Sequence, residues 1–125
     1  QGLQRSGWFD HAVYKAAAVI EQALAGSDET ATRALDLFID CYAAETSNLA
    51  LKGMTLGGIY VGGQIAPRIL TAMDQGRFMQ RFVKKGKMER LMVIRRMSED
   101  LAMPVRVIIE DRAALIGAAA VARGF

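Results

Sequence analysis

A chain of 125 residues has room for a single domain with one modest hydrophobic core. Its 52% hydrophobic and 23% charged residues are typical of a globular protein and exclude an intrinsically disordered one. No apolar run reaches the roughly 18 residues that a transmembrane helix needs. The single cysteine, Cys41, excludes an internal disulfide framework and fits a reducing cytoplasm. The chain starts at Gln1 without methionine or signal-like residues, so we expect it to be part of a longer protein.

The net charge of +3 is unevenly distributed. Positions 68–96 hold nine basic residues against two acidic ones, a local charge of +7. The basic residues are Arg68, Arg77, Arg81, Lys84, Lys85, Lys87, Arg90, Arg95 and Arg96. Such a stripe can attract nucleic acid or nucleotide phosphates. A solvated helical face is the favoured interpretation, because the aromatic residues here, Phe78 and Phe82, have the i, i+4 spacing of a core-facing pair.

Two helices are predicted in the first half of the chain. Apolar residues recur near every 3.6 positions from Trp8 to Ala25, and Gly26 ends this helix. Ser27 or Asp28 then begins a second helix that runs from about Glu29 to Lys52. Its predicted core-facing stripe consists of Ala31, Ala34, Leu35, Phe38, Cys41, Tyr42 and Leu49.

Three residues in these helices could bear chemistry, and each has a simpler interpretation. Cys41 lies in the apolar pattern, which indicates an inert core cysteine rather than a reactive thiol. Asp36 and Asp40 share a helix face and could bind a metal, but no third ligand has suitable spacing, so a solvated face is favoured. His11, the single histidine, has no cysteine or acidic cluster around it and is expected at a surface or a helix end.

The segment Leu56–Leu70 predicts a short strand, a glycine turn and a helix. Ile59, Tyr60 and Val61 form an apolar run bounded by glycines, as in a strand covered on both faces. Gly62 and Gly63 lack Cβ atoms, which permits a sharp turn and a close approach of another group. A turn of this kind before a helix can bind a phosphate-bearing ligand, but it can also be no more than a tight connection.

The second half of the chain alternates between short helices and a strand. Helices are predicted over Pro67–Asp74, Arg77–Lys85 and Lys87–Leu101, with breaks at Gly76 and Gly86. A strand is predicted over Val105–Ile109, and Asp111 is expected to cap a final helix over Arg112–Arg123. A strand, intervening helices and a second strand predict a right-handed crossover between parallel strands. The fold class is therefore α/β, helix-rich, with at least two parallel strands.

Five segments of this chain together resemble the C-terminal part of bacterial glucokinases, in the hexokinase and actin-like ATPase superfamily. The segments are Asn48-Leu49-Ala50-Leu51, Gly57 through Arg68, Gly76-Arg77-Phe78 with Phe82, Lys85-Gly86-Lys87-Met88, and Pro104-Val105 followed by Leu115-Ile116-Gly117-Ala118-Ala119. The resemblance covers about Ala23 to Ala120. Three places depart from the family pattern: Gln64 replaces a common third glycine, Glu45-Thr46-Ser47 replaces common glycines, and Val93–Ala102 resembles an insertion.

The resemblance implies a partial ribonuclease H-like or actin-like ATPase domain. Residues 1–111 would belong to the large domain on the adenosine side of the ATP cleft, and residues 112–125 would form a closing helix that packs on a small domain. Gly62, Gly63 and Gln64 would contact the nucleotide, and ATP and Mg²⁺ would act in the full-length protein. No catalytic or metal-binding constellation is visible in the sequence, so we expect no catalytic residue and no metal ligand here.

The implied function is that of a C-terminal fragment of an ATP-dependent glucokinase, a cytoplasmic transferase of glycolysis. The fragment alone is expected to be inactive. Its partners would be ATP, glucose and a second copy in a homodimer, with neither nucleic acid nor membrane. The alternative is a non-catalytic kinase-like domain of a sugar-responsive transcriptional regulator, which the departure at Gln64 slightly favours.

Overall fold

The computed structural model describes residues 16–55, 57–96 and 99–124. Trp8, the predicted start of the first helix, and His11, which was expected at a surface or a helix end, lie outside the described residues. The chain divides into two compact units, the first ending at Ile39 and the second starting at Asp40. Helices dominate both the first unit and the second, and the strands all belong to the second. The fold is therefore a helix-rich α/β arrangement, as predicted.

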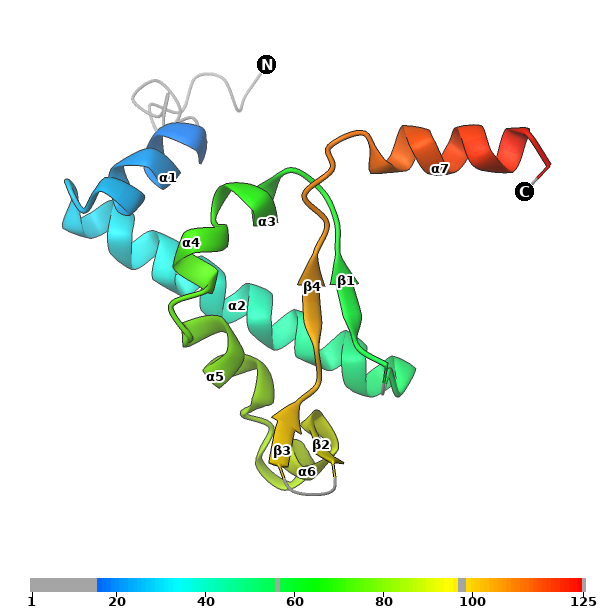
Figure 1. Cartoon of the computed structure of the whole chain (residues 1–125). Helices are drawn as coiled ribbons and strands as arrows, with labels where there is room; N and C mark the ends of the chain where they lie inside the picture. Colours follow the sequence, from blue (N-terminus) through cyan, green and yellow to red (C-terminus); the bar gives the residue numbers. More distant parts are fainter. Residues whose placement is uncertain (1–15, 56, 97–98, 125) are drawn as a thin grey trace, which may run out of the picture. The chain divides into compact units, whose positions relative to one another are not determined.

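Helices and strands alternate in the order drawn in Figure 1. The helices are α1 (Ala16–Ala25), α2 (Glu29–Gly53), α3 (Ile65–Arg68), α4 (Leu70–Met73), α5 (Arg77–Val83), the 3₁₀ turn η2 (Gly86–Met88), α6 (Glu89–Met92) and α7 (Ala113–Ala122). The strands are β1 (Ile59–Val61), β2 (Val93–Arg96), β3 (Glu99–Ala102) and β4 (Val105–Val107).

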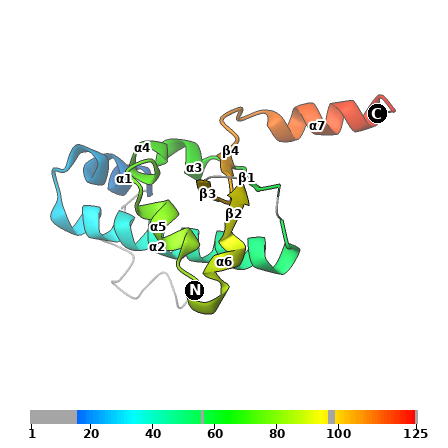
Figure 2. The same cartoon turned by 60° about the horizontal axis from the view of Figure 1, so that its bottom comes forward.

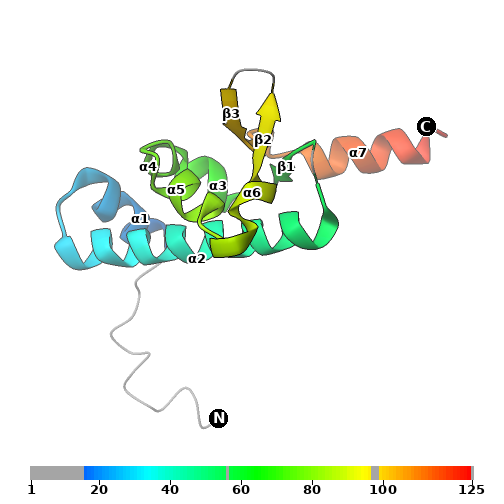
Figure 3. The same cartoon turned by 90° about the horizontal axis from the view of Figure 1, so that it is seen from below.

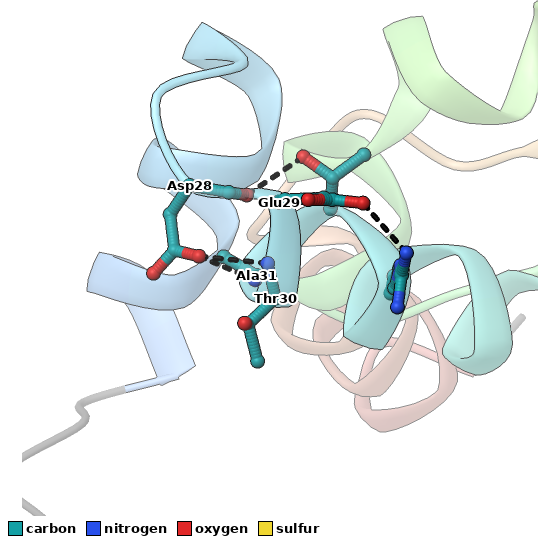
Figure 4. A network of polar contacts seen from close by, with 6 residues as sticks. Asp28, Glu29, Thr30 and Ala31 are labelled. Carbon is teal, nitrogen blue, oxygen red and sulfur yellow. Dashed lines mark hydrogen bonds and ion pairs between the residues drawn. The ribbon is translucent and has the colours of Figure 1, made fainter.

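The connection between α1 and α2 follows the sequence signals closely. Gly26 adopts a left-handed conformation with φ +65° after the last residue of α1. The Asp28 carboxylate caps α2 by accepting hydrogen bonds from the backbone N–H groups of Thr30 at 2.7 Å and Ala31 at 3.3 Å (Figure 4). Of the two residues predicted to begin this helix, the structure selects Asp28.

The buried face of α2 differs from the predicted stripe. Its buried residues are Ala31, Leu35, Ile39, Ala43, Thr46, Ser47 and Ala50. Ala34, Phe38, Cys41 and Leu49 are exposed, so the prediction fails at these positions, and the expectation of a core cysteine is wrong. The reason is size: four of these seven residues are alanine or serine, whereas a hydrophobicity pattern favours large residues.

The aromatic residues of α5 form the core that the sequence predicts. Phe78 and Phe82 are buried, and their rings stack with centroids 6.1 Å apart. Tyr42 of α2 meets Phe78 edge-on at 6.2 Å. This cluster joins α5 to the second-unit part of α2.

β1 and β4 pair in parallel, which confirms the predicted parallel arrangement of the two strands. Ile59 lies opposite Val105 and Val61 opposite Val107 (Figure 1). The Ile59 N–H donates to the Pro104 carbonyl at 2.9 Å, and the ladder continues beyond Val61. β1 was predicted to be covered on both faces, and this is wrong for the face that carries Tyr60. The Tyr60 side chain is 67% exposed, and the Arg106 guanidinium lies over its ring at 5.7 Å from the centroid.

A hairpin replaces most of the helix predicted over Lys87–Leu101. Only η2 and α6 are helical, and β2 then pairs with β3 in antiparallel register (Figure 3). The register pairs Arg95 with Asp100 and Arg96 with Glu99, which are basic residues paired with acidic ones along the sequence. This charge pattern and the β-branched start of β2 favour a hairpin over the helical periodicity of the methionines and leucines. The hairpin occupies the stretch that resembles an insertion.

Two helix starts also differ from the predictions. The helix expected from Pro67 starts at Ile65 and breaks at Ile69, which gives α3 and α4. Asp111 does not cap α7, because Arg112 is the N-cap residue and makes no side-chain cap. The Glu110 carboxylate accepts the Arg112 N–H instead, at 3.0 Å. Among the described residues, no side chain therefore caps the first turn of α7 in the way expected of Asp111.

α7 contains no charged residue and leaves its large side chains in solvent. Leu115 and Val121 are 71% and 73% exposed. A helix that is apolar on all sides is usually buried. None of the described helices is long and apolar enough to cross a membrane.

The buried Ser47 hydroxyl joins α2 to α5 and gives the first prediction. Its oxygen donates to the Phe82 carbonyl at 2.6 Å. Ser47→Ala should lower the free energy of unfolding by about 1–2 kcal/mol, because a buried carbonyl loses its partner and the better helix propensity of alanine offsets only part of that loss. Urea titration measures this. Ser27→Ala, the same change at an exposed position, is the control and should cost less; equal effects would contradict the buried tie.

Candidate functional site

The predicted site residues form the turn between β1 and α3. Gly62, Gly63 and Gln64 follow the last residue of β1, and all are exposed. Gly63 has φ +104°, a conformation that side-chain-bearing residues rarely adopt. Apart from its two chain neighbours, no described residue has an atom within 4 Å of a Cβ atom built on Gly63. The turn therefore presents open backbone to its surroundings.

Gly58, a second glycine at positive φ, is required by packing within the chain. Gly58, with φ +108°, precedes β1, and a Cβ atom there would lie 2.5 Å from the Pro104 carbonyl oxygen. Packing of β1 against the start of β4 thus explains Gly58. Packing against the described residues does not explain Gly63, whose intrachain reason is its positive φ alone. The space beside Gly63 allows a ligand to approach the backbone closely.

The end of β4 lies at the same edge as this turn, because carboxyl ends of parallel strands meet. Glu110 and Arg112 follow β4, and their side chains pair at 3.4 Å. The Arg112 N–H, which donates to the Glu110 carboxylate, is the main reason that the pKa of Glu110 lies below its ordinary value of 4.5. This pair was not predicted from the sequence, although the predicted parallel crossover places the residues that follow the two strands at the same edge of the sheet.

The Asp36–Asp40 pair is not a metal site in this structure. The Asp40 carboxylate accepts hydrogen bonds from Nε and Nη2 of Arg77, at 2.9 and 2.6 Å. Within residues 16–55, 57–96 and 99–124, no cluster of three or more histidine, cysteine, aspartate or glutamate residues could hold a metal.

Comparison with known proteins identifies the family. The family model described as Glucokinase matches residues 1–124. This chain belongs to the glucokinase family.

Several curated glucokinases are similar to the chain. A glucokinase of Synechocystis sp. is 45% identical over 104 residues, which are 83% of this chain and 27% of that protein. A glucokinase of Nostoc sp. is 40% identical over 116 residues, or 93% of this chain and 32% of that protein. One of Mesorhizobium japonicum is 39% identical over 101 residues, 81% of this chain and 27% of the relative. The chain thus spans roughly 27–32% of the length of these relatives.

Two of the segments that resemble glucokinases touch each other in the structure. The Lys85 ammonium donates to the Asn48 side-chain oxygen at 2.6 Å and to the Ala44 carbonyl at 3.2 Å. Asn48 belongs to the segment near the end of α2, and Lys85 follows α5. This contact, the Ser47–Phe82 hydrogen bond and the Asp40–Arg77 ion pair connect α2 to α5 and to the residues after it. Figure 2 labels both helices.

The Asp40–Arg77 pair gives a pH-dependent prediction. The hydrogen bonds from Arg77 hold the pKa of Asp40 below its ordinary value of 3.8. A lowered pKa in the folded state means that the stabilisation is complete above that ordinary value and is lost as the pH falls through the folded value. Asp40→Asn should therefore cost about 0.5 kcal/mol near neutral pH, since the pair is partly exposed, and progressively less below about pH 4.

Urea unfolding at neutral and acidic pH measures this difference. Asp74→Asn is the control, because Asp74 is exposed and has no ion pair within the described part of the chain. A cost for Asp40→Asn that is independent of pH would contradict the assignment.

Proposed function

We propose that the chain is the C-terminal portion of an ATP-dependent glucokinase, which converts ATP and D-glucose to ADP and glucose 6-phosphate. The observation that supports this most directly is the open Gly63 backbone in a chain of the glucokinase family. Because the chain spans under a third of its relatives, the activity would reside in a longer protein that contains it. The chain alone is proposed to be inactive.

The glycine turn is proposed to contact the adenosine side of ATP. Gly63 would let the nucleotide lie against the backbone, Gly62 would complete the turn, and Gln64 would border the site. ATP would supply the γ-phosphoryl group for in-line transfer, and Mg²⁺ would supply the positive charge that neutralises it. No described residue is assigned to Mg²⁺ or to catalysis. The sugar site and the general base would lie in the rest of the protein.

The remaining expectations follow from the same proposal. Residues 1–111 would form part of the large domain of an actin-like ATPase fold, and residues 112–125 would pack on a small domain. The protein would be cytoplasmic and homodimeric. The exposed Leu115 and Val121 support an external partner for α7, since large apolar side chains rarely stay in solvent together.

A non-catalytic kinase-like domain of a sugar-responsive regulator is the second candidate. Gln64 supports it, because its exposed side chain stands where a third glycine is common and makes no cap to α3. A helix-turn-helix upstream and the lack of a base aspartate would favour this candidate. A sugar-binding set with a base aspartate would favour the kinase.

Gly63→Val tests the nucleotide contact. In the longer protein, a branched side chain beside the turn should weaken ATP binding at least about tenfold, or about 1.4 kcal/mol, and leave glucose binding unchanged. Gly57→Val is the control, because Gly57 lies in open space before β1, at its other end. Calorimetric titration with ATP measures both variants, with thermal unfolding to verify folding. Unchanged ATP affinity in folded Gly63→Val would refute the contact.

A coupled assay of glucose phosphorylation tests the activity itself. The longer protein should phosphorylate glucose with ATP, whereas the purified 125-residue chain should not exceed a heat-killed control. The expected inactivity reflects the absence of a candidate base. Activity of the isolated chain, or none in the longer protein, would contradict the proposal.

A further inference from the structure

A shallow cleft lies on the second unit. It is lined by residues of α5 and by Asp40 of α2, the two helices labelled in Figure 2. Its volume is about 240 Å³, and its lining residues are Asp40, Arg77, Gln80, Arg81 and Lys84. The three residues of α5, Arg77, Gln80 and Arg81, recur at i, i+3 and i+4, so the helix presents them on one face. Lys84 is the residue that directly follows α5. The space is large enough for a small molecule with one or two phosphate groups.

The cations of this cleft are only partly neutralised. Arg77 is held in place by its two hydrogen bonds to Asp40. Arg81 and Lys84 have no ion pair within the part of the chain that the structure describes, and both are exposed. The cleft thus contains three cations against one carboxylate. Held side by side on a helix, like charges repel each other, and an anion between them would relieve that repulsion.

We propose that this cleft binds a small phosphorylated molecule through Arg81 and Lys84, with the Gln80 amide as a further donor. Guanidinium groups match the geometry of phosphate oxygens, and Asp40 keeps the Arg77 side chain oriented at the rim. The ligand is a small molecule and not a nucleic acid strand, because the neighbouring rings of Phe78 and Phe82 are buried and cannot stack bases. None of the residues that line this cleft belongs to the glycine turn, so the proposed ligand is additional to the nucleotide of the proposed kinase activity.

Titration of the purified protein with pyrophosphate tests the site without reference to activity. Binding should saturate, and raising the salt concentration should weaken it. The double variant Arg81→Ala/Lys84→Ala should raise the Kd at least about tenfold. Lys87→Ala removes an exposed cation of the same basic segment that does not line the cleft, and it should leave the Kd within about twofold.

Two results would overturn the proposed phosphate site, one in favour of nonspecific attraction and one in favour of a nucleic-acid surface. Absence of saturation, or equal weakening by Lys87→Ala, would overturn the proposal in favour of nonspecific attraction. A DNA oligonucleotide that binds and is not displaced by pyrophosphate would overturn it in favour of a nucleic-acid surface. If thermal unfolding shows that the double variant is not folded, the single variants Arg81→Gln and Lys84→Gln replace it, and each should still weaken pyrophosphate binding. Folded single variants with unchanged affinity would overturn the assignment.

Discussion

The hydrogen bond from the buried Ser47 hydroxyl to the Phe82 carbonyl is the contact on which the second unit depends. The small, fully buried Ser47 side chain allows this direct contact between α2 and the α5 backbone. A larger residue at Ser47 would force the helices apart, and an apolar one would leave a carbonyl without a partner. Asp40 and Asn48 on the same helix extend the contact at its two sides through Arg77 and Lys85.

This contact continues toward the parallel strands. The Ser47 oxygen lies 4.0 Å from the Met92 sulfur at the end of α6. The Met103 N–H, after the hairpin, donates to the Met92 carbonyl at 2.7 Å, and Thr55 contacts the Met103 sulfur. Pro104 comes next and accepts the first hydrogen bond of β1. The position of the glycine turn is thus linked to the α2–α5 contact through buried methionines, which fill such irregular space well.

Local signals were sufficient for some elements. The glycines at 26, 76 and 86 end or separate helices as predicted, since their positive φ angles are a property of the residue itself. The parallel strands were recognisable from their apolar runs. The buried face of α2 was not, because small residues are selected by a neighbour that is distant in sequence. The hairpin and the hydrogen bond from the Arg112 N–H to Glu110 also depend on which residues pair, and hydrophobic periodicity carries no information about pairing. For the candidate site, the turn itself was predicted, whereas the partner of Asp40, 37 residues away, was not.

A double-mutant cycle between Asn48 and Lys85 tests most directly whether the contact between α2 and the end of α5 organises the second unit. The four proteins are the unmodified chain, Asn48→Ala, Lys85→Met and the double variant, and the measurement is the free energy of unfolding in urea. We expect a coupling energy of at least about 0.5 kcal/mol, because the Lys85 ammonium donates a hydrogen bond to the Asn48 side-chain oxygen. Strictly additive effects would contradict it.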